Sequence, residues 1–131
     1  MAHASLDLNL QDLWAIDTGC TRHLTRSRAN FVEYTALPSS AKTINGVGGT
    51  SCQPTGYGTV KLECSENNNR VVLLLSNVFH VPDSRVNLIS VSQLIDLDAE
   101  IDFTKSHCFI KHGKHQLTGS GRNGLWFLNL L

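Results

Sequence analysis

The chain has 131 residues, in which 11 Lys and Arg residues balance 11 Asp and Glu residues, so the formal net charge is zero. Zero net charge without a local run of basic residues argues against a protein that binds by neutralising phosphates, and we expect no direct nucleic-acid partner. The length favours one domain. A chain of this size can build a core without relying on disulfides or metals.

The start of the chain has no features of a targeting or membrane segment. Residues 1–12 are predicted to be a flexible N-terminal segment and 13–131 to form the folded domain. The opening MAHASLDLNLQ lacks the basic and apolar regions of a secretory signal, and the longest apolar run, Val71–Leu75, is too short to cross a membrane. We therefore expect a soluble, cytoplasmic protein without a membrane partner, with its four cysteines reduced.

From Leu13 onward, short apolar or alternating segments recur between clusters of Gly, Pro, Asn and Ser, which is typical of an all-β barrel or sandwich. The predicted strands are Leu13–Ile16, Lys42–Val47, Thr59–Cys64, Arg70–Leu75, Val78–Val81, Val86–Ile89, Ile101–Phe103, Cys108–His112 and Leu125–Leu130. Polar turns are predicted at 66–69 and 111–114.

One short helix is predicted at 90–97. Ser90 followed three residues later by Gln93 fits a capping box, in which the two side chains bond the first turn of a helix. The apolar residues of this segment fall on one helical face. We expect that face to pack on the strands.

An acidic residue ends the first predicted strand. Leu13–Ile16 runs directly into Asp17, Thr18 and Gly19, so a carboxylate stands where a buried strand ends and a glycine allows a sharp turn. Such a position can hold a reactive acid, and Asp17 is the predicted catalytic residue. The tripeptide alone is also compatible with an ordinary turn.

A glycine-rich segment follows about thirty residues later. Ile44–Thr50 has glycine at three of four successive positions between strand-like sequences, which predicts a mobile hairpin tip. The residues of this tip are Asn45, Gly46, Val47, Gly48 and Gly49.

The sequence predicts an acid loop, then a flexible hairpin, and then an apolar pair before a helix. This is the order found in retroviral-type aspartic protease subunits. The sequence resembles the protease region of copia-type LTR retrotransposon polyproteins, a branch of the retropepsin-like aspartic proteases. The matching segments are Leu13–Thr25, Asn77–Pro82, Asn87–Leu94 and Gly124–Leu128. Cysteine and histidine are frequent in this family at the positions of Cys20 and His23.

The resemblance implies an all-β fold, namely a retropepsin-like closed β-barrel subunit with a flap hairpin, one short helix and extra C-terminal strands. Hydrolysis in this class needs two carboxylates that share one proton. The chain holds one Asp-Thr-Gly, so a second copy must supply the other in a homodimer. In the family, Thr18 supports the paired loops, Gly19 presents backbone to the substrate, and the Asn45–Thr50 hairpin closes as a flap.

The implied role is an aspartic endopeptidase that matures a retrotransposon Gag-Pol polyprotein, its polypeptide substrate, within virus-like particles in the cytoplasm. The resemblance implies no cofactor. It assigns 13–131 to the protease domain.

The sequence departs from the retroviral pattern in two places. Thr21 and Val91 stand where retroviral subunits place an acidic and a basic residue that pair, so another group must support the acid loop, with Arg22 or His23 as candidates. Thr104–Leu131 is longer than the retroviral tail and predicts one or two extra strands, which leaves open how the dimer closes.

Three alternatives accompany the protease reading. Cys20, His23, Cys108 and His112, with His115 nearby, could supply a zinc site, although no CxxC pair is present. A thiol nucleophile at Cys20 is disfavoured, because nothing beyond His23 could act as its base and orienting group. A protease-derived β-barrel that no longer cleaves and acts as an interaction module is the alternative from a different functional class.

Overall fold

The computed structural model describes residues 13–39, 44–45 and 51–131. The strands are β1 (Trp14–Asp17), β2 (His23–Thr25), β3 (Phe31–Ala36), β4 (Ile44–Asn45), β5 (Ser51–Cys52), β6 (Gly56–Glu66), β7 (Asn69–His80), β8 (Asn87–Ser90), β9 (Glu100–Phe103), β10 (His107–His112), β11 (His115–Arg122) and β12 (Leu125–Leu128). The helix is α2 (Val91–Asp96). The fold is mostly β with one short helix among the described residues, as predicted. No helix within these ranges is long and apolar enough to span a membrane.

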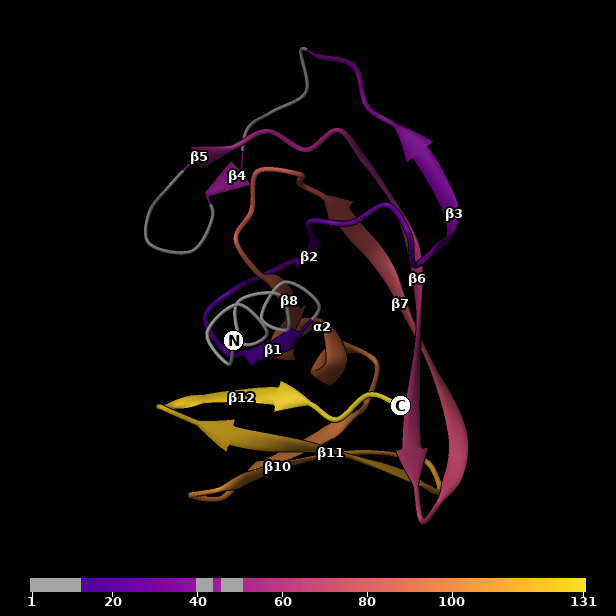
Figure 1. Ribbon diagram of the computed structural model, residues 1–131, viewed down its shortest axis with the longest axis vertical. Helices are drawn as coiled ribbons and strands as arrows, with labels where there is room; N and C mark the ends of the chain where they lie inside the picture. Colours follow the sequence, from indigo (N-terminus) through magenta and orange to yellow (C-terminus); the bar gives the residue numbers. More distant parts are fainter. Residues whose placement is uncertain (1–12, 40–43, 46–50) are drawn as a thin grey trace, which may run out of the picture.

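Ten of the described strands form one sheet in the order β3-β6-β7-β2-β8-β1-β12-β11-β10-β9, and β4 pairs with β5 separately. The long β6–β7 hairpin runs along one side of the molecule, while β10, β11 and β12 lie at the end opposite β4 and β5 (Figure 1). β8 is parallel to β1 and antiparallel to β2, and β2 is parallel to β7. β1 therefore lies in the middle of the sheet.

The prediction of a closed barrel is wrong, because no ladder joins the two edges of the sheet in the part of the chain that the structure describes. The edge strands β3 and β9 carry Glu33, Glu100 and Asp102, and charged side chains on an edge disfavour further strand pairing. An isolated antiparallel bridge joins Cys64 of β6 to Leu130, after β12, but it involves neither edge strand. The result is a curled, open sheet.

Both predicted hairpin turns are present. Asn67 and Asn68 have φ values of 51° and 67° between β6 and β7, which is the left-handed conformation that a two-residue hairpin requires. Gly113, with φ 60°, occupies the turn between β10 and β11. β7 joins two segments predicted as separate strands, with a register shift against β6 and a positive φ at Asn77.

The central sheet buries side chains on both faces. Alternation along β1 sends Trp14 and Ile16 to the larger core and Ala15 to a smaller one. The larger core also takes side chains from β6, β7, β8, α2, β10, β11 and β12. The smaller core contains Leu24, Val81 and Leu88, with Cys20, Phe79, Val86 and Phe127 packed against it.

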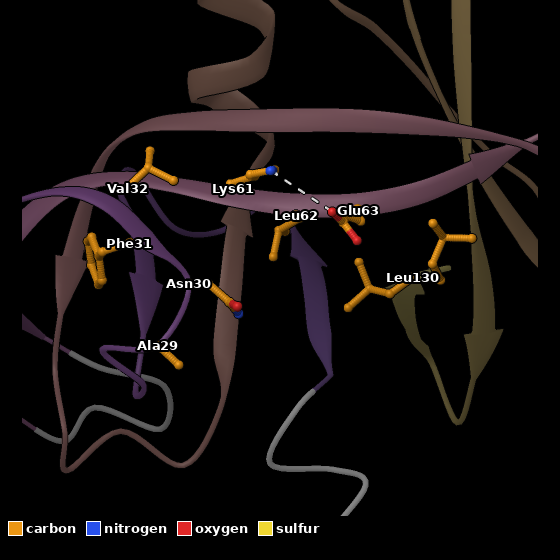
Figure 2. A pocket seen from close by; sticks show the side chains of 9 residues that line it. Ala29, Asn30, Phe31, Val32, Lys61, Leu62, Glu63 and Leu130 are labelled. Carbon is orange, nitrogen blue, oxygen red and sulfur yellow. Dashed lines mark ion pairs between the residues drawn. The ribbon is translucent and has the colours of Figure 1, made fainter.

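The segment after β12 reaches back to β6 and lines a pocket of about 320 Å³ (Figure 2). Its lining residues are Ala29, Asn30, Phe31, Val32, Lys61, Leu62, Glu63, Leu130 and Leu131. The ion pair at its rim, between Lys61 Nζ and Glu63 Oε1 at 4.0 Å, is largely exposed and adds little stability. This pocket contains no residue of the predicted site.

Candidate active site

Asp17 ends β1, in the centre of the sheet, and its carboxylate is half-buried. The backbone N–H of Gly19 donates a 2.7 Å hydrogen bond to Asp17 Oδ1. A Cβ at position 19 would lie 3.3 Å from that oxygen, so a side chain there would crowd the carboxylate. Thr18, between them, is exposed. The three predicted residues thus lie together at the start of the connection from β1 to β2. We call residues 17–22 the acid loop.

The start of α2 holds this loop in place. Ser90 is opposite Asp17 in the parallel β1–β8 ladder, and its Oγ donates to the carbonyl oxygen of Cys20 at 2.8 Å. The Gln93 side chain donates to the carbonyl oxygen of Thr21 at 2.9 Å. Ser90 caps the helix as predicted, since its Oγ accepts from the Gln93 N–H. The other half of the predicted capping box is replaced by the contact with the loop.

His23 supplies the support expected from Arg22 or His23. Its ring is only 2% exposed, and its Nδ1 accepts a 2.9 Å hydrogen bond from the backbone N–H of Ser90. Burial lowers the pKa of His23 to about 4, so the imidazole is neutral near neutral pH. Arg22 instead lies over the ring of Phe79, 5.7 Å from its centroid.

A buried asparagine ties the strands beneath the loop together. Asn87, at the start of β8, accepts hydrogen bonds through Oδ1 from Thr25 Oγ1 and from the Arg26 N–H. Its Nδ2 donates to the carbonyl oxygen of Leu13. The sequence signal for this residue is an amide side chain at the head of a strand with two large apolar residues.

The environment of the loop cysteine favours the neutral thiol. Burial, together with the nearby charge of Asp17, raises the pKa of the Cys20 thiol to about 11, so the thiolate is scarce at physiological pH. Burial also raises the pKa of Cys64 and Cys108 to about 11.

The acid loop opens on a largely apolar pocket of about 680 Å³. The pocket is lined by Leu13, Ala15, Ile16, Asp17, Thr18, Arg85, Val86, Leu88, Phe103, Gly124, Leu125, Trp126 and Phe127. One wall comes from the C-terminal strands, where Phe103 and Trp126 pack edge to face with ring centroids 4.8 Å apart. The predicted site had not included any residue of this wall.

The predicted hairpin tip lies mostly outside the described residues, which include only Asn45 of its five positions. At its base, β4 and β5 pair antiparallel, with Ile44 opposite Cys52 and Asn45 opposite Ser51. Next to this base, the Leu37 N–H bonds the carbonyl oxygen of Thr55. The two short strands that flank the predicted tip are therefore antiparallel neighbours.

The alternative zinc ligands do not come together. Among the residues that the structure describes, no three His, Cys, Asp or Glu side chains lie close enough to hold a metal ion. Cys108 lies in the larger core, His112 Nε2 contacts the carbonyl oxygen of Leu97, and His115 pairs with Glu66 at 2.9 Å. These three side chains therefore lie in separate parts of the structure, each with contacts of its own.

A family model described as the β-barrel domain of Pol polyproteins matches residues 14–99. The chain belongs to this family. A Saccharomyces cerevisiae protein named for the transposon Ty5-1 is 42% identical over 79 residues, which cover 60% of this chain and 47% of the yeast protein. The chain thus spans about half the length of that relative. No solved structure gives a significant match.

These comparisons place the protein among retrotransposon Pol polyprotein domains. The Pol family match begins with β1 and ends immediately before β9, so it contains the acid loop, Asn87 and the start of α2. The strands that form the aromatic wall of the pocket lie beyond the matched residues.

Proposed function

We propose that the protein is an aspartic endopeptidase that cleaves a retrotransposon Gag-Pol polyprotein and works as a homodimer. The observation that carries the proposal is the position of Asp17, at the end of a central buried strand and on the wall of a large apolar pocket. The Gly19 N–H fixes one carboxylate oxygen, and the family match to Pol polyproteins supports a polypeptide substrate.

The chemistry requires a second carboxylate. Two carboxyl groups about 3 Å apart share one proton, because adjacent like charges cannot both ionise. The chain has one Asp-Thr-Gly, so the second acid is Asp17 of another copy, related by a two-fold axis through the site. The exposed Thr18 and half-buried Asp17 are accessible to such a partner.

In the dimer, each residue has a distinct task. The ionised Asp17 accepts a proton from a water molecule, and the protonated Asp17 of the second copy donates to the carbonyl oxygen of the scissile peptide. An extended substrate aligns by backbone pairing, while the apolar pocket receives a side chain.

The biological setting follows from the proposed substrate. The protease acts in the cytoplasm within virus-like particles, where the polyprotein is concentrated. With zero net charge, it leaves nucleic-acid binding to other parts of the polyprotein.

Mixing active and inactive subunits tests both the acid and the dimer. We expect Asp17→Asn to lower cleavage of a polyprotein junction by at least about 1000-fold, while Asp83→Asn, an exposed aspartate outside the pocket, leaves it unchanged. When wild type is diluted into excess Asp17→Asn protein, activity should fall with the square of the wild-type fraction.

A linear fall in activity would contradict the shared site, and cleavage that survives Asp17→Asn would contradict the catalytic acid. Sedimentation of the same samples gives the oligomeric state. A stable dimer that cleaves no junction would instead support the non-catalytic interaction module.

A further inference from the structure

We propose, on the basis of the protease function above, that His23 is a positioning residue whose neutral ring holds the acid loop, so that its protonation sets the acid limit of activity. The proposed mechanism uses only the carboxylates. His23 touches neither the substrate pocket nor the reacting atoms, and it acts through Ser90.

The hydrogen bond to Ser90 defines the protonation state. A backbone N–H can only donate, so Nδ1 of His23 must present a lone pair, and the ring proton is on Nε2. A doubly protonated imidazole has no acceptor. Protonation therefore breaks this 2.9 Å bond and leaves the buried N–H of Ser90 without its acceptor.

A closed set of contacts carries the effect from His23 to Asp17. The acid loop leaves β1 at Asp17 and enters β2 at His23, and Ser90 pairs with Asp17 across β1 and β8. The Ser90 Oγ donates to the carbonyl oxygen of Cys20, in the middle of the loop. Displacement of Ser90 thus disturbs the loop at both its centre and its catalytic end.

The surroundings of His23 disfavour a charge. The strands paired with β2 are β7 and β8; β8 has no titratable side chain, and on β7 His80 lies opposite Thr25. The acid loop carries Asp17, Cys20 and Arg22, and α2 carries Asp96 at its far end. Burial alone is the cause of the lowered His23 pKa, of about 4.

Two substitutions separate the hydrogen bond from the titration. In His23→Asn, Oδ1 takes the place of Nδ1 as an acceptor but does not titrate, whereas His23→Leu introduces an apolar side chain that has no acceptor. His107→Asn is the matched control, because His107 is an exposed histidine on β10, outside the pocket.

We expect wild-type kcat to decline on the acid side with a midpoint near pH 4. His23→Asn should stay within about threefold of wild type at pH 6 and lose this decline, while His23→Leu loses at least about tenfold in kcat at pH 6, with a smaller change in KM. His107→Asn should follow wild type throughout.

Amide hydrogen exchange supplies a readout that needs no cleavage. In Asp17→Asn protein, the protection factor of the Ser90 N–H should fall at least about tenfold as the pH drops through 4. Adding His23→Asn to the Asp17→Asn protein should remove that fall. If His23→Asn does not fold, His23→Gln provides the second acceptor variant.

Two results would overturn the role of His23. One is a folded His23→Asn protein whose kcat declines at acid pH as in wild type; the other is a Ser90 N–H protection factor that stays constant down to pH 3. Absence of cleavage in every protein, with Ser90 protection changing as expected, would count against the protease function alone.

Discussion

The residues matched by the Pol family model and the C-terminal strands contribute different things to the site. Residues 14–99 provide the acid and the contacts that hold its loop. β9–β12, beyond the match, complete the sheet beside β1 and supply the aromatic wall of the pocket. Asp17 thus comes from the matched region alone, whereas the pocket in front of it is lined by residues of both regions.

The two regions nevertheless share one core. Trp14 and Ile16 of the first region pack in the same cluster as Ile110, Leu117 and Leu128 of the second. The contact is close at Gly119, where a Cβ would lie 2.8 Å from the Ile16 side chain. We therefore expect the regions to unfold together.

Removal of the C-terminal strands gives the largest expected effect. A chain ending at Phe103 loses the β12 partner of β1 and all core side chains of β10–β12. We expect it to show no cooperative unfolding transition in urea, monitored by circular dichroism. A two-state transition with the midpoint of the full chain would show that residues 14–99 fold independently.

Two leucines on β12 distinguish core from pocket wall. Leu128 is 2% exposed, so Leu128→Ala should lower the free energy of unfolding by about 2–5 kcal/mol. Leu125 is 53% exposed and lines the pocket, so Leu125→Ala should change stability by less than about 0.5 kcal/mol and raise KM instead. Urea denaturation and peptide cleavage check the pair; equal losses of stability would contradict the division.

The stability of the acid loop should depend on pH. The His23 pKa is lowered from 6.5 to about 4 in the folded protein, so the unfolded chain binds the extra proton more readily between these values. The stabilisation is fully present above pH 6.5 and is lost as the pH falls through about 4. It amounts to about 3 kcal/mol. Urea titrations of wild type and His23→Asn should diverge over this interval, and parallel curves would contradict it.

The smallest effect is expected at the helix cap. Ser90→Ala removes the cap of α2 and the bond to Cys20, and should cost about 1–2 kcal/mol of unfolding free energy. Asp96→Ala, at an exposed position at the far end of the same helix, should change it by less than about 0.5 kcal/mol. Thermal unfolding of the two proteins measures the difference, and an equal shift would remove the special role of Ser90.

Local features of the chain were predictable from sequence. The helix, the asparagine turn and the acid at the end of a buried strand follow from short-range rules of capping, backbone conformation and strand patterning. His23 could be predicted as a candidate support for the acid loop. The sequence could not show that its Nδ1 accepts a hydrogen bond from the Ser90 N–H.

The missed features depend on contacts between distant parts of the chain. β2 is three residues long, and β3 carries mostly half-buried or exposed side chains, so neither has a clear alternating pattern. β11 contains two glycines, which favour a loop in sequence but here allow close packing against Ile16 and Trp126. The open sheet was missed because edge pairing depends on tertiary arrangement.

The position of β1 also determines when the site can form as the polypeptide is made. Trp14–Asp17 is the first described strand in the chain, yet its two neighbours are β8 and β12, and Ala15 pairs with Phe127. Pairings between residues so far apart close large loops and slow folding. During synthesis, the segment bearing Asp17 leaves the ribosome before the β12 residues, so the sheet around β1 is complete only after those residues have emerged.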